Sequence, residues 1–217
     1  MLKAELISGG YIKGQPVIDD LSFRLEEGDK LLISGENGSG KTSLVRAIAG
    51  ELPWCTGILT VGSTALHAIP HWKRQQTSMG IFMQGAEVFP RLTGEENIRI
   101  ATDSGGKALL SEMLPWLTDR LPLLSQQTFR GKAGNYSGGE RAQLALAITL
   151  ASKPKIIVLD EPFAGLSGTN LQAVARTIND YNNEFGKAMI LIEQNIPVAT
   201  GMCNRKAILR QKKLFFG

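Results

Sequence analysis

Short apolar runs alternate with segments of helical periodicity along most of the chain. Alternating apolar positions predict half-buried strands over residues 4–7 and 17–25. Shorter apolar runs predict further strands at 30–34, 57–61, 79–83, 156–159 and 188–192, with 207–209 as a candidate for the last one. Continuously apolar strands that alternate with helices are typical of a parallel sheet covered on both faces, so the pattern predicts an α/β fold.

Apolar residues at helical spacing fill the segments between these strands. One helix follows the strand at 30–34 and ends at Gly50, a second has its buried stripe between Leu144 and Ala151, and a third lies around residues 170–181. From Thr93 to about Phe129 the composition shifts and leucines recur at helical spacing. This pattern predicts a helical insertion between the two halves of the sheet.

Two prolines, Pro115 and Pro122, interrupt the inserted segment. Proline removes a backbone donor and clashes inside a helix, so we expect about three short helices in the insertion. The chain as a whole is expected to form one domain over residues 1–217, with the helical subdomain at about residues 93–130.

Composition narrows the classes of function. The 217 residues are 43% hydrophobic and 20% charged, which suits one packed domain and excludes a disordered chain. Histidine occurs only at His67 and His71, which argues against a His-rich metal site and most Ser-His-Asp arrangements. The net charge is +4, but no basic run is longer than Lys212-Lys213 and no aromatic residues are interleaved with it. We therefore expect no nucleic-acid partner, although a basic patch facing anionic lipid or a membrane protein stays open.

Cysteine usage and hydropathy indicate a compartment. Cys55 and Cys203 are far apart and form no CxxC motif, which is typical of free thiols in a reducing compartment. No window approaches the ~18 consecutive apolar residues of a membrane helix, and the first residues lack the pattern of a secretory signal. We expect a cytoplasmic protein without direct membrane insertion.

The strongest chemical motif is Gly35-Glu36-Asn37-Gly38-Ser39-Gly40-Lys41-Thr42, which matches the phosphate-binding loop G-x-x-x-x-G-K-[ST]. Glycines let successive backbone N–H groups turn toward phosphate oxygens, and the next helix points its positive end at them. Lys41 is expected to reach the terminal phosphates of ATP, and the Thr42 hydroxyl to ligate Mg²⁺. The candidate nucleotide ligands here are Gly35, Asn37, Gly38, Ser39, Gly40, Lys41, Thr42 and Ser43. A chance glycine-rich turn is the alternative, which the flanking strand and helix disfavour.

A second motif follows the apolar strand at 156–159, where Asp160 and Glu161 come directly after it. Ligands of open α/β sheets bind at the carboxyl ends of the strands. Asp160 is expected to hold Mg²⁺ through water, and Glu161 to orient and polarise the attacking water. Two acids that merely cap the following helix are the alternative.

The third motif is Tyr136-Ser137-Gly138-Gly139-Glu140. Ser-x-x-Glu before an apolar helix is a capping box, which would be a purely structural role. Capping alone does not explain two glycines in the first helical turn, where glycine costs up to ~1 kcal/mol relative to alanine. Close approach of a ligand to the backbone does explain them, and a capped helix N-terminus is itself an anion site.

These motifs, in this order, resemble the nucleotide-binding domains of ABC transporters. The phosphate loop, the Gln84 segment, the helical insertion, the Ser-Gly-Gly-Glu segment and the Asp-Glu strand together span essentially the whole chain. The resemblance implies a P-loop fold of ABC type, in which a mainly parallel sheet is flanked by helices and joined by an antiparallel β subdomain. Tyr136 stands where leucine is more usual in the family's signature sequence.

The resemblance also implies a composite site for ATP. In this family two such domains face head to tail, and each ATP lies between the phosphate loop of one domain and the signature of the other. Ser137, Gly138, Gly139 and Glu140 would then serve the partner's nucleotide, and hydrolysis would move attached permease subunits that dock at the helical insertion. Tyr11 stands where the family stacks an aromatic ring on adenine, although a packed strand residue is the alternative. Gln84 would contact Mg²⁺ and the attacking water.

The chain departs from the family pattern at two positions. Gln194 follows the strand at 188–192 where most members have a histidine that contacts the γ-phosphate, and Ser167 stands where many have aspartate. Glutamine can donate a hydrogen bond to phosphate but carries no charge. Glu193-Gln194 resembles one of the two unequal ATPase chains of branched-chain amino-acid and urea-type importers, so a heterodimer with a chain that has the histidine is favoured.

The expected function is therefore ATP hydrolysis that powers a membrane transporter from its cytoplasmic face, with Glu161, Gln84, Lys41 and Gln194 as the catalytic candidates and Thr42, Gln84 and Asp160 as the metal candidates. Two alternatives stay open: an ABC ATPase that acts outside transport, and a weakly hydrolysing nucleotide sensor in a heterodimer.

Overall fold

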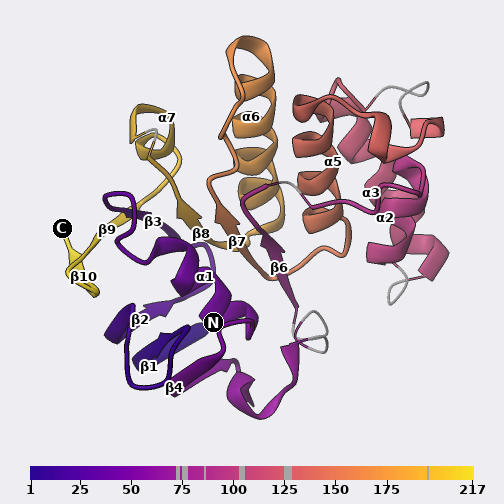
Figure 1. The fold of residues 1–217 in the computed structure, drawn as a ribbon. Coiled ribbons are helices and arrows are strands. Elements are labelled where there is room, and N and C mark those ends of the chain that lie inside the picture. Colours follow the sequence, from indigo (N-terminus) through magenta and orange to yellow (C-terminus); the bar gives the residue numbers. More distant parts are fainter. Residues whose placement is uncertain (72–73, 75–77, 86, 103–105, 125–128, 195) are drawn as a thin grey trace.

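The computed structural model describes residues 1–217 except 72–73, 75–77, 86, 103–105, 125–128 and 195 (Figure 1). Two sheets organise it. The larger sheet has six strands in the order β10-β9-β3-β8-β7-β6. Its strands are β3 (Lys30–Ser34), β6 (Met79–Phe82), β7 (Ile156–Asp160), β8 (Ala188–Ile192), β9 (Arg205–Arg210) and β10 (Lys213–Phe216).

Parallel pairing runs through five of these six strands. β3 pairs with β8 and β9, and β7 pairs with β6 and β8, all in parallel, whereas β10 closes an antiparallel hairpin with β9. Every residue of the central strands β7 and β8 is buried, which is why both read as uninterrupted apolar runs in the sequence. Parallel pairing brings the carboxyl ends of β3, β6, β7 and β8 to the same edge of the sheet.

The second sheet is antiparallel, with the order β2-β1-β4-β5. It consists of β1 (Leu2–Gly10), β2 (Ile18–Leu25), β4 (Trp54–Val61) and β5 (Thr64–Ala65). A short 3-10 turn, η1 (Leu66–Ala68), follows it. The predicted antiparallel β subdomain and mainly parallel sheet are thus both confirmed.

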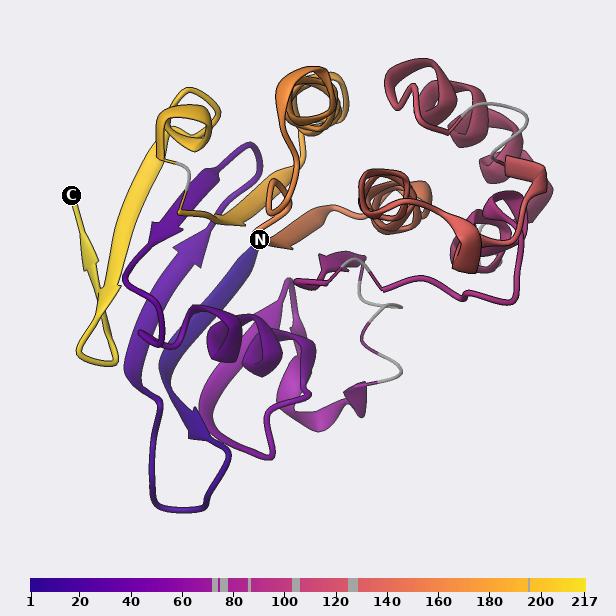
Figure 2. The same cartoon turned by 45° about the horizontal axis from the view of Figure 1, so that its top comes forward.

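Helices cover the two faces of the six-stranded sheet. α1 (Lys41–Ala49) packs on one face together with the antiparallel sheet, in a core that includes Ile33, Val158 and Ile190. α5 (Gly138–Ala151) and α6 (Gly168–Phe185) pack on the other face, against residues such as Leu159 and Leu191. Figure 2 shows the sheet between these layers, with the short α7 (Ile196–Thr200) on the side of α6.

The inserted segment lies beyond α5, far from the C-terminal hairpin (Figure 1). It contains α2 (Gly94–Thr102) and α3 (Gly106–Arg120), and a 3-10 turn, η4 (Ala133–Asn135), leads on to α5. A third helix before residue 129 would fall largely outside the described residues. Met113, Leu117, Leu121 and Leu124 are buried, so the predicted apolar stripe forms the core of the insertion.

The expectation that Pro115 ends a helix is wrong, because α3 continues through it to Arg120. Pro115 is exposed, while Met113 and Leu117 on either side of it are buried and hold the helix in place. The carbonyl that loses its helical donor belongs to Ser111, an exposed residue, so water can satisfy it. Pro122 does mark an end, since α3 stops two residues before it.

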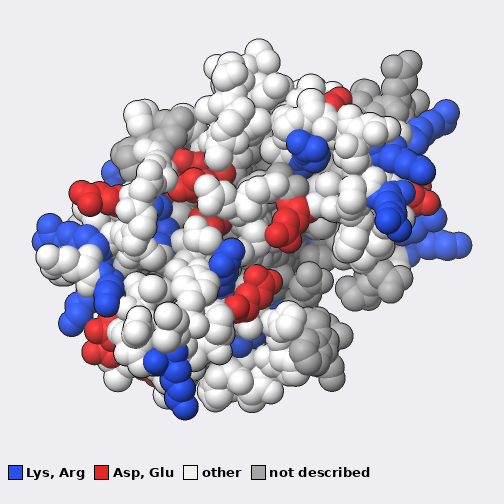
Figure 3. All heavy atoms as spheres, viewed as in Figure 1, with Lys and Arg blue, Asp and Glu red and all other residues white. Residues whose placement is uncertain are grey.

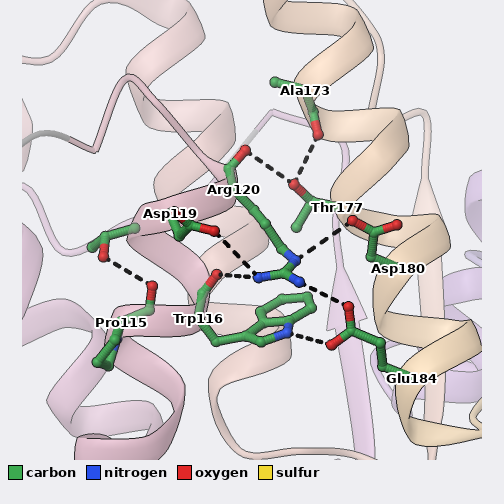
Figure 4. Close-up of polar contacts among 9 residues, drawn as sticks. Pro115, Trp116, Asp119, Arg120, Ala173, Thr177, Asp180 and Glu184 are labelled. Atoms are coloured by element: carbon green, nitrogen blue, oxygen red, sulfur yellow. Dashed lines mark hydrogen bonds and ion pairs between the residues drawn. The ribbon is translucent and has the colours of Figure 1, made fainter.

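A polar cluster joins the insertion to the core where α3 meets α6 (Figure 4). The Arg120 guanidinium lies 4.3 Å from the centre of the Trp116 ring and forms ion pairs with Asp180 at 3.5 Å and Glu184 at 2.8 Å. The Trp116 indole donates to Glu184 over 2.7 Å. The Thr177 hydroxyl donates to the backbone carbonyl of Arg120 over 3.3 Å. The C-terminal end of α3 is thus tied to α6 through both side chains and backbone.

Charged side chains are unevenly spread over the surface. On the face in Figure 3, many basic side chains lie toward two ends, over the β9–β10 hairpin and over the helical insertion, and side chains of both signs lie between them. None of the helices in the described part of the chain is long and apolar enough to span a membrane. Both cysteines are free thiols, as expected.

Candidate functional site

The carboxyl ends of four parallel strands carry most of the predicted site residues. The phosphate loop follows β3, Gln84 follows β6, Glu161 follows β7 and Gln194 follows β8. Parallel pairing therefore brings together side chains from positions 35 to 194 of the chain. This is the edge at which open α/β sheets bind ligands.

The phosphate loop turns from β3 into α1 through glycines with left-handed backbone. Gly38 and Gly40 have φ values of 78° and 104°, and a Cβ on Gly40 would lie 2.8 Å from the Val17 carbonyl oxygen. Only glycine fits there without strain. The Lys41 ammonium donates to the carbonyl oxygens of Gly35 and Glu36 over 2.8 and 2.9 Å, so it closes the loop on itself. A bound phosphate would compete with these carbonyls for Lys41.

Two polar side chains beside this loop are buried without hydrogen-bond partners among the described residues. They are the Ser39 hydroxyl and the Asp160 carboxylate, both of whose oxygens are unbonded. Burial raises the pKa of Asp160 most, and the charge of Glu161 raises it further, whereas the Thr42 hydroxyl and the charges of Lys41 and Arg46 lower it. The Thr42 contact falls outside hydrogen-bond geometry and the two cations only partly offset burial, so the carboxylate is costly in the single chain, as expected for a group that a ligand completes.

Glu161 is held by two amides. Gln84 Nε2 donates to its Oε2 over 2.9 Å, and Gln194 Nε2 donates to its Oε1 over 2.5 Å. The backbone of Glu161 is left-handed, with φ of 51°, a conformation that costs an L-residue about 1–2 kcal/mol. Strain of this kind is typical of functional positions. The Glu161 N–H bonds to Ile192 O over 2.9 Å, which keeps the turn attached to β8.

Gln194 also reaches the phosphate loop. The same Nε2 donates to Asn37 Oδ1 over 2.7 Å. A continuous chain of hydrogen bonds therefore runs from the loop after β3, through the loop after β8, to the carboxylate after β7.

Tyr11 follows β1 by one residue and is 46% exposed, so it is not a packed strand residue. Its hydroxyl lies 3.3 Å from Ser43 Oγ and accepts a hydrogen bond from Arg46 over 3.1 Å. The tyrosine ring is thus attached to the first turns of α1, next to the phosphate loop.

The Ser-Gly-Gly-Glu segment is separate from this cluster. Ser137 caps α5 and accepts from the Glu140 N–H over 3.3 Å, while the Glu140 carboxylate accepts from the Ser137 N–H over 2.7 Å. The capping box is therefore real. A Cβ on Gly138 would meet no atom of the described residues within 4 Å, so nothing in that part of the chain requires glycine there. Because α1 and α5 cover opposite faces of the sheet, the two glycine-rich segments begin helices on opposite sides.

Sequence reasoning missed one buried carboxylate in the site. Glu193 is 3% exposed, and its Oε1 accepts from the Phe163 N–H over 3.1 Å while its Oε2 accepts from the Gln194 N–H over 2.9 Å. It therefore ties the turn after Glu161 to the loop that carries Gln194. An acidic residue directly after a fully apolar strand was the signal that could have indicated it.

Comparison with known proteins identifies the family. A family model described as ABC transporter matches residues 18–164, which is most of the chain. The chain belongs to the ABC transporter family. It is thus an ATP-binding and ATP-hydrolysing subunit of the kind that powers these transporters.

Relatives of this family align along almost the whole chain. The high-affinity branched-chain amino acid transport ATP-binding protein BraG of Pseudomonas aeruginosa is 29% identical over 99% of this chain and 91% of its own length. The lipopolysaccharide export system ATP-binding protein LptB of Escherichia coli K12 is 26% identical over 98% of this chain and 88% of its own. Among solved structures, an ATP-binding subunit of an ABC transporter superposes with a TM-score of 0.89 at 24% identity, covering 100% of this chain and 89% of that one. The dimeric post-hydrolysis cassette MJ0796 superposes with a TM-score of 0.87 at 20% identity, over 99% and 96%. The two structures confirm the fold.

Proposed function

We propose that this chain hydrolyses ATP at the carboxyl edge of the six-stranded sheet and passes the resulting movement to a membrane permease. The observation that carries the proposal is the Glu161 carboxylate, held between Gln84 and Gln194 on the edge that also bears the phosphate loop. Glu161 orients the attacking water and accepts its proton, Lys41 neutralises charge on the terminal phosphates, and Gln194 donates to the γ-phosphate.

The residues present fit a magnesium ion. Asp160 offers two buried carboxylate oxygens without hydrogen-bond partners, and the Thr42 hydroxyl lies close enough to affect its pKa. Asp160 and Thr42 would hold the ion, with Gln84 beside them, and bound Mg²⁺ neutralises charge on the phosphate oxygens. No cluster of three or more His, Cys, Asp or Glu side chains suited to a metal occurs in the described ranges, which fits an ion held mainly by substrate phosphates and water.

The nucleotide also requires a second ATPase chain. The open space at Gly138 supports this, because it leaves room for a ligand brought from outside the chain. We propose that Ser137, Gly138, Gly139 and Glu140 contact the nucleotide held by the partner's phosphate loop. The relative MJ0796, whose structure is described as dimeric and bound to ADP and phosphate, has the same fold.

The partner chain is proposed to differ from this one. Gln194 replaces the usual histidine, so an unequal pair in which the other chain carries that histidine would restore a charged donor at one of the two sites. The names of BraG and of the probable LivF of Archaeoglobus fulgidus, which is 28% identical, favour import of branched-chain amino acids as the transport reaction.

The permease was expected to dock at the helical insertion, and we propose that its docking surface extends to a cavity of about 330 Å³ lined by residues outside 93–130. It lies between α5 and the segment that follows Gln84, and its lining includes Met83, Val88, Phe89 and Ile148. The Phe89 side chain is 52% exposed, so its ring is available to an apolar partner at this cavity. Docking here would place the chain on the cytoplasmic face of the membrane and connect the permease directly to Gln84.

The test is Glu161→Gln in the assembled transporter. The amide has the same size and shape as the carboxylate but cannot accept a proton from water. The rate of phosphate release should therefore fall by at least about a hundredfold, while fluorescent ATP still binds. Glu112→Gln is the matched control, because this carboxylate pairs with Lys153 on the surface and should leave turnover unchanged. Full turnover in Glu161→Gln would refute the mechanism, and no turnover in the wild-type complex would favour a nucleotide sensor.

A further inference from the structure

The Gln194 amide nitrogen lies between two acceptors, Glu161 Oε1 at 2.5 Å and Asn37 Oδ1 at 2.7 Å. An ionised carboxylate can only accept hydrogen bonds, so Glu161 determines which end of the Gln194 amide faces it. Asn37 must then turn its oxygen, not its nitrogen, toward Gln194. The orientation of both amides therefore follows from the charge of Glu161.

A primary amide nitrogen carries two hydrogens, and both are used here. While both bonds are intact, Gln194 Nε2 has no hydrogen left for a phosphate oxygen. One bond must open before Gln194 can donate to ATP. The bond to Glu161 is shorter and charge-assisted, which makes it about twice as strong as a neutral amide–amide bond. The bond to Asn37 is the one that opens.

We propose that Asn37 is a positioning residue whose side-chain oxygen holds the place of a γ-phosphate oxygen. It keeps Gln194 aimed at the phosphate position until ATP arrives, and the phosphate then replaces it as the acceptor. The inference rests on the proposed function, in which Gln194 donates to the γ-phosphate. Asn37 and Gln194 are both exposed in the single chain, so without this bond the glutamine would sample other rotamers.

The role of Asn37 depends on glutamine at position 194. A histidine ring nitrogen carries at most one hydrogen, so one nitrogen cannot donate to Asn37 and Glu161 at the same time. The two bonds from a single nitrogen to Asn37 and Glu161 therefore depend on glutamine at position 194. The replacement of the usual histidine by Gln194 thus links the phosphate loop to Glu161.

The test is Asn37→Ala in the assembled transporter, with Gln194 intact and in a Gln194→Ala background. With Gln194 intact, the affinity for fluorescent ATP and kcat/KM should each fall about threefold or more, because the glutamine is then ordered only when ATP binds, while kcat at saturating ATP changes less than about twofold. In the Gln194→Ala background the same substitution should change the affinity less than about twofold, because the residue that Asn37 positions has been removed. Asn183→Ala is the control, since Asn183 also accepts one side-chain bond, from Lys30 over 2.7 Å, but lies on α6.

The outcomes distinguish the positioning role of Asn37 from the proposed role of Gln194 as a donor to the γ-phosphate. An equal loss of affinity from Asn37→Ala in both backgrounds, or no loss in either, would overturn the positioning role, and the first result would leave Asn37 a simple nucleotide ligand. If Gln194→Ala alone keeps full turnover, the proposed role of Gln194 fails as well. If Gln194→Ala loses turnover and Asn37→Ala leaves the affinity for ATP unchanged, only the positioning role is wrong.

Discussion

Two regions of this molecule use polar side chains in opposite ways. At the carboxyl edge of the six-stranded sheet, Asp160 and Ser39 are buried without hydrogen-bond partners among the described residues, and Lys41 is bonded to carbonyls of its own loop. Where α3 meets α6, Arg120 faces the carboxylates of Asp180 and Glu184, and Trp116 donates to the latter (Figure 4).

The difference separates binding from positioning. Polar groups that lack partners, or have partners that an anion can replace, belong to a place that a ligand completes. Polar groups that meet opposite charges and an aromatic ring at once hold two elements in a fixed relation. The helical insertion carries the segment that leads to Ser137, so the cluster around Arg120 helps to set where that segment stands relative to the sheet.

The largest expected effect comes from Gly138→Ala, which tests whether the start of α5 contacts the nucleotide held by the partner chain. A Cβ there meets no atom within 4 Å in the described part of the chain, and alanine stabilises a helix by up to ~1 kcal/mol relative to glycine. The variant should therefore melt at the same temperature or higher, yet lose about a hundredfold in ATP turnover in the assembled transporter, because the partner's nucleotide needs that space. Calorimetry and phosphate release measure the two effects.

A stable Gly138→Ala variant with normal turnover would mean that the start of α5 acts only as a helix cap. Gly186→Ala is the control for the general effect of replacing a glycine at a helix end by alanine. Gly186 ends α6 with a φ of 61°, so alanine there should destabilise the protein without a specific effect on turnover.

The second prediction concerns Arg120→Ala. The Arg120 side chain is 23% exposed, so its ion pairs are partly shielded from water, and its stacking on Trp116 adds to them. Its removal should lower the free energy of unfolding by about 1–2 kcal/mol, as measured by urea denaturation. Arg99→Ala is the matched control, because the Arg99–Glu95 pair on α2 is 64% and 47% exposed and should cost less than about 0.5 kcal/mol. Equal effects of the two variants would contradict the positioning role.

Sequence reasoning anticipated which residues the structure brings together in the candidate site, but not those of the cluster around Arg120. The phosphate loop and the Asp160-Glu161 pair are contiguous motifs whose chemistry dictates both residue type and spacing. The sequence pattern alone was therefore enough to predict how these residues are arranged. The cluster around Arg120 joins residues 64 positions apart, and neither Trp116 nor Glu184 belongs to any local pattern. Contacts of this kind depend on how helices pack, which periodicity alone does not specify.

Local rules also failed where tertiary structure compensates for their cost. Pro115 was expected to end a helix, but burial of the residues around it outweighs one lost backbone bond at an exposed carbonyl. The hairpin partner β10 was not predicted, since Lys213–Phe216 has neither alternation nor length to distinguish it from a loop. Asn37 was assigned only to the nucleotide, because its bond to Gln194 spans 157 positions.

The smallest expected effect is on stability, in Asp160→Asn without nucleotide. Burial raises the pKa of Asp160, so the folded state holds its proton more tightly than the unfolded state does. Below the ordinary carboxyl pKa of 3.8 both states are protonated and the carboxylate costs nothing. As the pH rises above that value the unfolded state ionises first, and the penalty on folding grows until the pH passes the folded pKa. At pH 7 the neutral amide should therefore raise the free energy of unfolding by on the order of 1 kcal/mol, with no gain at acid pH.

Asp119→Asn provides the control, since the Asp119 side chain is 82% exposed and should leave stability unchanged at either pH. A destabilised Asp160→Asn at pH 7 would mean that the carboxylate is already satisfied in the nucleotide-free protein. The contrast between the two regions would then be wrong for Asp160. A carboxylate that is stable without a ligand gives no reason to expect a ligand beside it.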